Sequence, residues 1–192
     1  MKAIMISIQP QGVSKILNKE KLVEIRKTMP KCELPCKVYI YYAKGKKLYK
    51  CVSNSDEDLL NGKVVAEFTL NKVDTLERDL NDWLPKNRYD VSNDLLKDIN
   101  LNQNELWNYG QGKTLYAWHI DDLKIYDKPK ELSEFSHFIP NNKCPTKQCG
   151  TNCEDCPNYD EEHETCLALY YAHRAIKRPP QSYCYVEELE DE

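Results

Sequence analysis

The sequence predicts an α+β fold: a small mixed β-barrel with short helices and a cysteine-rich loop that binds a metal. Five or six segments have the apolar or alternating patterns of strands, whereas few have helical spacing. One predicted helix lies between the first two strands, and this order suggests a mixed barrel. The segment 140–166 is rich in Cys, Pro, Asn and Asp and cannot build an apolar core, so we expect a metal to hold it together.

The individual elements are predicted from apolar patterning and from turn and capping residues. Val13, Ile16 and Leu17 recur at helical spacing directly after the first strand. Ser92 and Asn102 are candidate N-caps of two later helices. The expected strands are 2–8, 22–26, 37–43, 63–70, 115–125 and 182–187, and the expected helices are 12–18, 93–99 and 103–109.

The charge balance argues against nonspecific binding of duplex nucleic acid over the whole surface. Lys and Arg total 27 and Asp and Glu total 31, which gives a net charge of −4. Binding through counterion release would therefore need a local basic patch, for which 15–31 is the candidate. No segment approaches the roughly 18–20 apolar residues of a membrane span, and no signal peptide is visible. We therefore expect a cytoplasmic protein with no membrane partner.

Nine cysteines in a chain expected to be cytoplasmic indicate metal binding rather than disulfides. Five of them have short spacings that let thiolates converge on one ion, namely Cys144, Cys149, Cys153, Cys156 and Cys166. Four thiolates saturate a structural zinc ion, so one cysteine is spare, and which four bind stays open. An iron–sulfur cluster is the second interpretation, and reduced thiols without a metal are the third.

A second candidate site combines basic side chains with a carboxylate. Glu24 and Arg26 are two residues apart on a predicted strand and share a face, and Lys21 reaches them if the backbone bends there. At a barrel mouth these groups would bind a base edge and a phosphate, because Arg donates through a fork and Glu accepts from an exocyclic amine. Lys27 and Trp118 complete the predicted ligand-binding set, with Trp118 as a stacking platform. The alternatives are a Glu24–Arg26 surface ion pair and a core position for Trp118.

The order of these residues and elements resembles that of ASCH domains, which are similar to the PUA barrel. The main part of the resemblance is a short helix after the first strand, followed by Lys21 and then by a strand with a Glu-x-Arg motif formed by Glu24 and Arg26. The stretch 178–186 looks like the ending of ASCH-like proteins in bacterial and phage genomes. The remaining similar stretches are 7–10, 62–68 and 116–120. The resemblance covers 1–139 and 167–188, so 140–166 becomes an inserted zinc knuckle and 189–192 an acidic tail.

The resemblance implies a PUA-like fold and, in most relatives, the reading of RNA or modified bases. One branch resembles amidohydrolases that deacylate the exocyclic amine of cytidine with Lys, Thr and Glu. Lys21 matches that Lys and Glu67 is the nearest candidate acid, but Glu24 stands where the branch has Thr. The first hypothesis is therefore a regulatory module that binds RNA or a modified nucleotide. The alternatives are an N-acylcytidine amidohydrolase with Lys21 and Glu67 as catalytic residues, and a phage-encoded adaptor for a protein partner.

Overall fold

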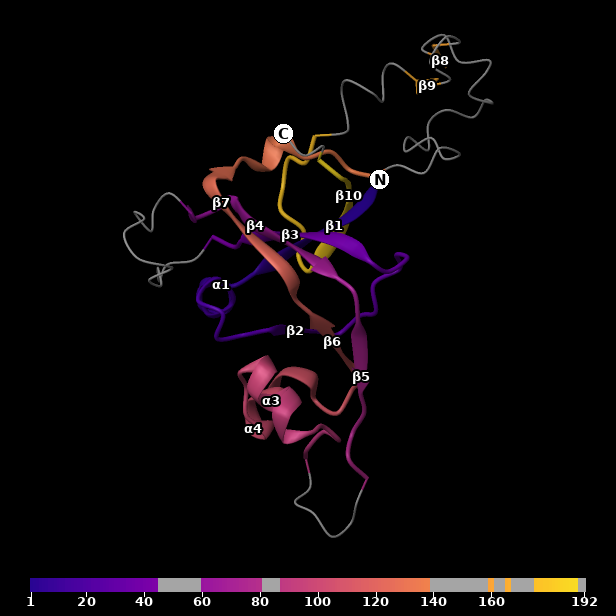
Figure 1. Ribbon diagram of the computed structural model, residues 1–192. Coiled ribbons are helices and arrows are strands. Elements are labelled where there is room, and N and C mark those ends of the chain that lie inside the picture. Colours follow the sequence, from indigo (N-terminus) through magenta and orange to yellow (C-terminus); the bar gives the residue numbers. More distant parts are fainter. Residues whose placement is uncertain (45–59, 81–86, 139–158, 161–164, 167–174, 190–192) are drawn as a thin grey trace.

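The computed structural model describes residues 1–44, 60–80, 87–138, 159–160, 165–166 and 175–189. These residues form an α+β fold with two main sheets and three short α-helices (Figure 1). The strands are β1 (Lys2–Ile8), β2 (Val23–Arg26), β3 (Cys36–Tyr42), β4 (Val64–Leu70), β5 (Val73–Leu76), β6 (Leu115–His119), β7 (Asp121–Lys130), β8 (Tyr159–Asp160), β9 (Thr165–Cys166) and β10 (Tyr183–Glu187). The helices are α1 (Pro10–Leu17), α3 (Asn93–Ile99), α4 (Gln103–Gly110) and the 3-10 turn η1 (Leu132–Glu134).

The larger sheet has five strands in the order β10-β1-β3-β4-β7. β1 pairs in parallel with β3, whereas the β1–β10, β3–β4 and β4–β7 pairs are antiparallel. The parallel pair arises because α1 and β2 carry the chain from the end of β1 back to the start of β3. Pairing with β10 places the last strand of the chain beside the first (Figure 1).

The smaller sheet has three antiparallel strands in the order β2-β6-β5. Two short connections join it to the larger sheet, because β4 continues into β5 and β6 continues into β7. The single strand expected over 115–125 is therefore two strands, and Asp122 has a positive φ of 49° just after the break. The sequence predicts a small mixed β-barrel, and the described residues form an α+β fold with no closed barrel. β2 ends after four residues and pairs only with β6, so the two sheets remain separate.

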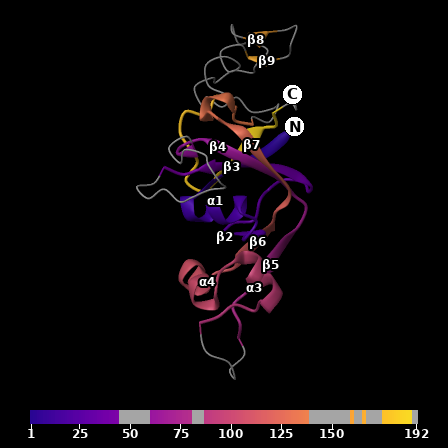
Figure 2. The same ribbon diagram turned by 60° about the vertical axis from the view of Figure 1, so that its left-hand side comes forward.

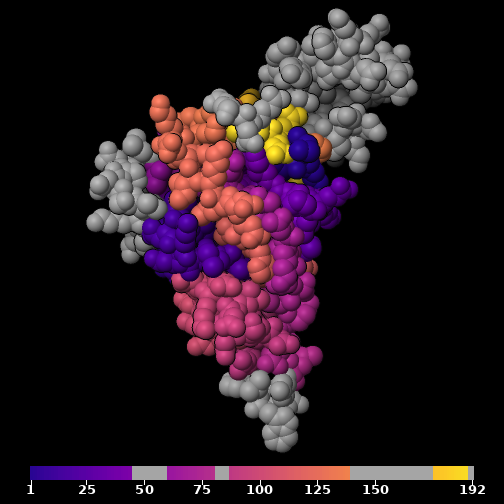
Figure 3. Space-filling view, viewed as in Figure 1, coloured from indigo at the N-terminus to yellow at the C-terminus, as the bar shows by residue number. Residues whose placement is uncertain are grey.

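Apolar side chains form three clusters that follow from strand alternation. The largest lies between the sheets and combines one face of β1 and β3 with α1 and Trp118. The second covers the opposite face of the larger sheet, where Met5 and Tyr39 pack with Phe135. The third joins the outer face of the smaller sheet to α3 and α4, which lie beside β5 and β6 in Figure 2. In Figure 3, α3 and α4 lie at one end of the described residues and β10 lies at the opposite end.

Local sequence signals account for the starts of the helices. α1 begins at Pro10. Proline is tolerated there because the N–H that it lacks would have no hydrogen-bond partner in the first turn of a helix. The Ser92 side chain accepts a hydrogen bond from the Leu95 N–H at the start of α3. Asn102 and Glu105 form a reciprocal capping box at the start of α4. The N-caps predicted for α3 and α4 are confirmed.

The remaining described segments lie outside the two main sheets. β8 and β9 form an antiparallel pair within the predicted insertion 140–166, most of which lies outside the described residues. Leu189, the first residue of the predicted tail, donates its N–H to the Tyr39 hydroxyl at 2.8 Å, so the tail starts on the larger sheet. Within the described ranges, no helix has the length and apolarity needed to cross a membrane.

Candidate functional site

The basic residues and the carboxylate predicted around the second strand come together in the structure. The side chains of Val23 and Ile25 pack with α3 and α4, and strand alternation directs Glu24 and Arg26 to the other face of β2. The Nζ of Lys21 lies 2.7 Å from Oε2 of Glu24, and the Nε of Arg26 lies 3.3 Å from Oε1 of the same carboxylate. We call these three residues the Lys21–Glu24–Arg26 cluster.

A backbone bend after α1 brings Lys21 to the carboxylate. Lys19 has a positive φ of 60°, a left-handed conformation that turns the chain at the end of the helix. The N–H groups of Glu20 and Lys21 both donate to the carbonyl oxygen of Lys15, at 2.8 and 3.1 Å. The bend that the sequence argument required for Lys21 is therefore present.

All three members of the cluster are buried. Lys21 is 9% exposed, Glu24 is 6% exposed and Arg26 is 7% exposed. The Nη2 of Arg26 also donates to the carbonyl oxygen of Ser7, in β1, at 2.9 Å. The cluster carries two positive charges and one negative charge. Burial makes these interactions stronger than those of the exposed ion pair that the sequence left as an alternative.

The cluster retains unused hydrogen-bonding capacity. The Oε2 of Glu24, the Nε of Arg26 and the Nε1 of Trp118 are buried atoms with no aligned hydrogen-bond partner among the described residues. The short ion pairs of Glu24 bring opposite charges together without the geometry of a hydrogen bond. Buried polar atoms without partners are rare in proteins, and a ligand or an ordered water commonly satisfies them. The Lys21–Glu24–Arg26 cluster and the neighbouring Trp118 therefore contain polar atoms whose hydrogen bonds the described residues do not complete.

Trp118 supports the cluster from inside the core. It is 0% exposed and is the cross-strand partner of Glu24 in the β2–β6 pair. Its ring lies edge-on to Tyr183, with 5.7 Å between the centroids. The structure therefore places Trp118 in the core, which was the alternative considered for it, and leaves no ring face on which a base could stack.

Tyr109 is an aromatic residue beside the cluster that the sequence reasoning missed. It lies in α4 and is 37% exposed, and the exposed Lys27 places its Nζ 4.8 Å from the ring centroid. Burial raises the pKa of Tyr109, the charge of Arg26 opposes this shift and the charge of Glu24 adds to it, so both residues lie near the hydroxyl. A half-exposed ring next to cations can stack on a nucleobase. No local pattern distinguishes this tyrosine from the others in the chain.

Two solved structures share this arrangement of elements. The crystal structure of an ASCH protein from Zymomonas mobilis superposes with a TM-score of 0.51 and 15% identity, over 97% of this chain and 88% of that chain. A tyrosine-to-phenylalanine variant of the same protein gives a TM-score of 0.51 and 14% identity, over 98% and 92% of the two chains. The structural neighbours are ASCH proteins. The likeness confirms the fold resemblance seen in the sequence, although no protein-family model and no curated protein matches this sequence.

Within the ASCH-like fold, Glu67 lies on a different surface from the cluster. It belongs to β4 and faces the second apolar cluster, on the side of the larger sheet that is turned away from the space between the sheets. Its carboxylate accepts a hydrogen bond from the Tyr126 hydroxyl at 2.5 Å and lies 3.7 Å and 3.9 Å from the Nζ atoms of Lys37 and Lys124. The structure therefore does not bring the two predicted catalytic candidates together.

The predicted metal site is mostly outside the part of the chain that the structure describes. Cys144, Cys149, Cys153 and Cys156 are not among the described residues, and Cys166 is described only as part of β9. The described residues contain no group of three or more side chains that could hold a metal ion. Structural zinc and the iron–sulfur alternative both stay predictions from the sequence.

Proposed function

We propose that this chain is an ASCH-type module that binds RNA or a modified nucleotide at the Lys21–Glu24–Arg26 cluster. The observation that carries the proposal is a buried set of ion-paired side chains in which Oε2 of Glu24 and Nε of Arg26 have no hydrogen bond among the described residues. Burying three ionised groups is costly unless they are paired and fully hydrogen-bonded. A bound ligand could complete the missing hydrogen bonds and so offset the cost of burying these charges, which a purely structural ion pair would not do.

The chemistry of the cluster fits the edge of a nucleobase. The Glu24 carboxylate accepts hydrogen bonds from an exocyclic amine, while Arg26 and Lys21 donate to ring or carbonyl acceptors. Tyr109 offers a ring on which the base can stack, and the exposed Lys27 can bind an adjacent phosphate. Because little of the cluster is exposed, the ligand would reach it through a base edge rather than through a long stretch of backbone.

The overall charge favours a single-stranded or mononucleotide ligand over a duplex. The chain has a net charge of −4, so few phosphates would be neutralised on binding. A ligand held through one or two phosphates has a shallow salt dependence, with a logarithmic slope of about −1 to −2. A steep dependence would instead indicate an extended basic surface.

The two other functions receive less support. An amidohydrolase would need a hydroxyl beside Lys21, where this chain has Glu24, and it would need Glu67 in the same site. Glu67 is instead paired with Tyr126 on another face of the sheet. A protein-binding role for a phage-encoded adaptor rests on the cysteine-rich segment, most of which lies outside the described residues.

The test is equilibrium binding of a panel of nucleosides, modified nucleosides and labelled single-stranded RNA oligonucleotides to the full chain. Lys21→Ala should weaken binding at least about tenfold, because it removes a charged donor from the site. Lys97→Ala is the matched control, because Lys97 is an exposed lysine in α3 that pairs only with the exposed Asp94 in the structure described. Unchanged affinity in folded Lys21→Ala would reject the site. Tyr109→Ala, at a half-exposed position, tests the same surface if Lys21→Ala does not fold.

A further inference from the structure

Two thiols outside the proposed ligand site lie unusually close to each other. Cys32 belongs to the connection between β2 and β3, and Cys36 is the first residue of β3. Both are free cysteines, and their Sγ atoms are 2.8 Å apart. The sulfurs of a disulfide are separated by about 2.05 Å, so a small side-chain movement would bring this pair to bonding distance.

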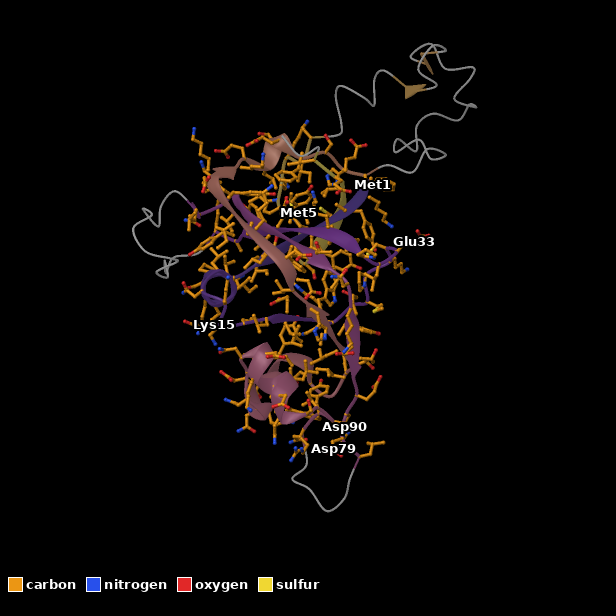
Figure 4. All side chains as sticks on the ribbon, in the orientation of Figure 1. Met1, Met5, Lys15, Glu33, Asp79 and Asp90 are labelled. Atoms are coloured by element: carbon orange, nitrogen blue, oxygen red, sulfur yellow. The ribbon has the colours of Figure 1, made fainter. Side chains whose placement is uncertain are left out.

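We infer that Cys32 and Cys36 form a reversible dithiol–disulfide pair whose co-reactant is a small-molecule disulfide such as oxidised glutathione. Only Glu33, Leu34 and Pro35 separate the two cysteines, and all three are exposed. Glu33 projects from the edge of the molecule in Figure 4. A small oxidant can therefore approach the pair from solvent. The inference does not depend on the proposed nucleotide site.

The surroundings of the two sulfurs set the order of the reaction. Cys36 is 7% exposed and packs between the sheets, whereas Cys32 is half-buried. Burial, followed by the hydrogen bond with Cys32, raises the pKa of Cys36 and so disfavours its thiolate. Cys32 is the more accessible of the two sulfurs, so it reacts first, after losing its proton to solvent. It attacks one sulfur of oxidised glutathione, forming a mixed disulfide and releasing one glutathione thiolate. Cys36 then loses its proton to solvent and attacks the Cys32 sulfur, which releases the second glutathione thiolate. The protein loses two electrons, and the reagent is reduced to two thiols.

Hydrogen bonds before Cys32, and the pairing of Cys36 with Leu70 in the larger sheet after it, hold this loop in place before any oxidation. The Lys31 N–H donates to the Tyr185 hydroxyl at 2.7 Å, and the Lys2 Nζ donates to the Lys31 carbonyl oxygen at 2.5 Å. The Tyr183 hydroxyl donates to the Met29 carbonyl oxygen at 3.4 Å. The loop is therefore fixed on β1 and β10. Since the sulfurs are already positioned by the fold, ring closure is favoured over the same reaction in the unfolded chain.

The pair can be followed in a single peptide. Lys31 and Lys37 flank it, so trypsin releases residues 32–37 with both cysteines. The full-length protein is equilibrated with mixtures of reduced and oxidised glutathione, trapped with iodoacetamide, digested and analysed by mass spectrometry. The expected product is a peptide without alkyl groups that is lighter than the dithiol by two hydrogens. The equilibrium constant for its formation should be at least about tenfold larger in native protein than in protein kept unfolded in urea.

Several outcomes would overturn the inference. A peptide that carries two alkyl groups in the most oxidising mixture excludes the disulfide, and glutathione retained on Cys32 without ring closure excludes Cys36 as the partner. Equal equilibrium constants in native and unfolded protein would show that the fold does not position the pair. Cys36→Ser should stop at the mixed disulfide. Cys184→Ser, which changes another described thiol, should form the disulfide as the unaltered chain does, and its failure to do so would reject the pairing.

Discussion

Replacing Glu24 by Gln should lower the free energy of unfolding by about 3 kcal/mol. The substitution keeps the side-chain shape but leaves Lys21 and Arg26, which are 9% and 7% exposed, as buried cations without a counter-charge. Removing one partner of a buried ion pair costs about 3–5 kcal/mol. The lower end applies because Arg26 keeps its bond to the Ser7 carbonyl oxygen. In a chain of this size such a loss lowers the melting temperature by about 6–12 °C.

Urea unfolding followed by tryptophan fluorescence measures this change as a shift of the midpoint at constant slope. Asp94→Asn is the matched control, because it neutralises the carboxylate of an ion pair with Lys97 whose side chains are 91% and 77% exposed. Its effect should stay below about 0.5 kcal/mol. If Glu24→Gln unfolds at the same urea concentration as Asp94→Asn, or at a higher one, the electrostatic account of the cluster is refuted.

Three further predictions concern other parts of the chain. Gly110→Ala should lower the unfolding free energy by about 1–3 kcal/mol in thermal melts, because the new Cβ would overlap the buried Tyr89 hydroxyl, and an unchanged melting temperature would contradict this packing. Asp74→Asn should destabilise the protein by less than about 1 kcal/mol at neutral pH. Burial raises the pKa of Asp74, but hydrogen bonds and charges from Lys72 and His119 lower it by more, so the pKa lies below its usual value. The benefit of the ionised carboxylate is therefore complete above its unfolded pKa and disappears as pH falls below about 4, so pH-independent destabilisation would contradict the assignment. Elemental analysis of protein purified without chelator should find about one zinc per chain and no colour, whereas iron with visible absorption would support a cluster.

Local patterns predicted most of the described strands, and tertiary pairing decided the rest. Strands such as 2–8 and 37–43 are apolar enough to be recognised alone, and their bounds change by one residue at most at either end. β5 was missed because it has only four residues, of which one is buried, and its identity depends on pairing with β6. The strand expected over 115–125 is interrupted after His119, where the chain passes from the smaller sheet to the larger one. The alternation of apolar and polar residues does not reveal this change of sheet. Barrel closure likewise depends on which edges meet.

The residues of the candidate site also differ in whether local sequence patterns or tertiary pairing determined their positions. Lys21, Glu24 and Arg26 are neighbours in sequence, so a strand period and one bend were enough to predict their contact. Glu67 comes from another strand, and its face could be assigned only from the register of β4 with its neighbours. Tyr109 reaches the cluster from α4, far along the chain, through helix packing that a single sequence does not encode in any short motif.

The position of β2 at the edge of its sheet has a consequence for association between molecules. In the part of the chain that the structure describes, β2 is bonded to β6 alone, but its four residues are buried, so the rest of the fold covers its free side. Proteins discourage strand pairing between molecules with short edge strands and with charged side chains that point inward. β2 has four residues, and two of them are Glu24 and Arg26. The charges proposed to bind a ligand would therefore also discourage strand pairing at this edge if the cover over β2 opened.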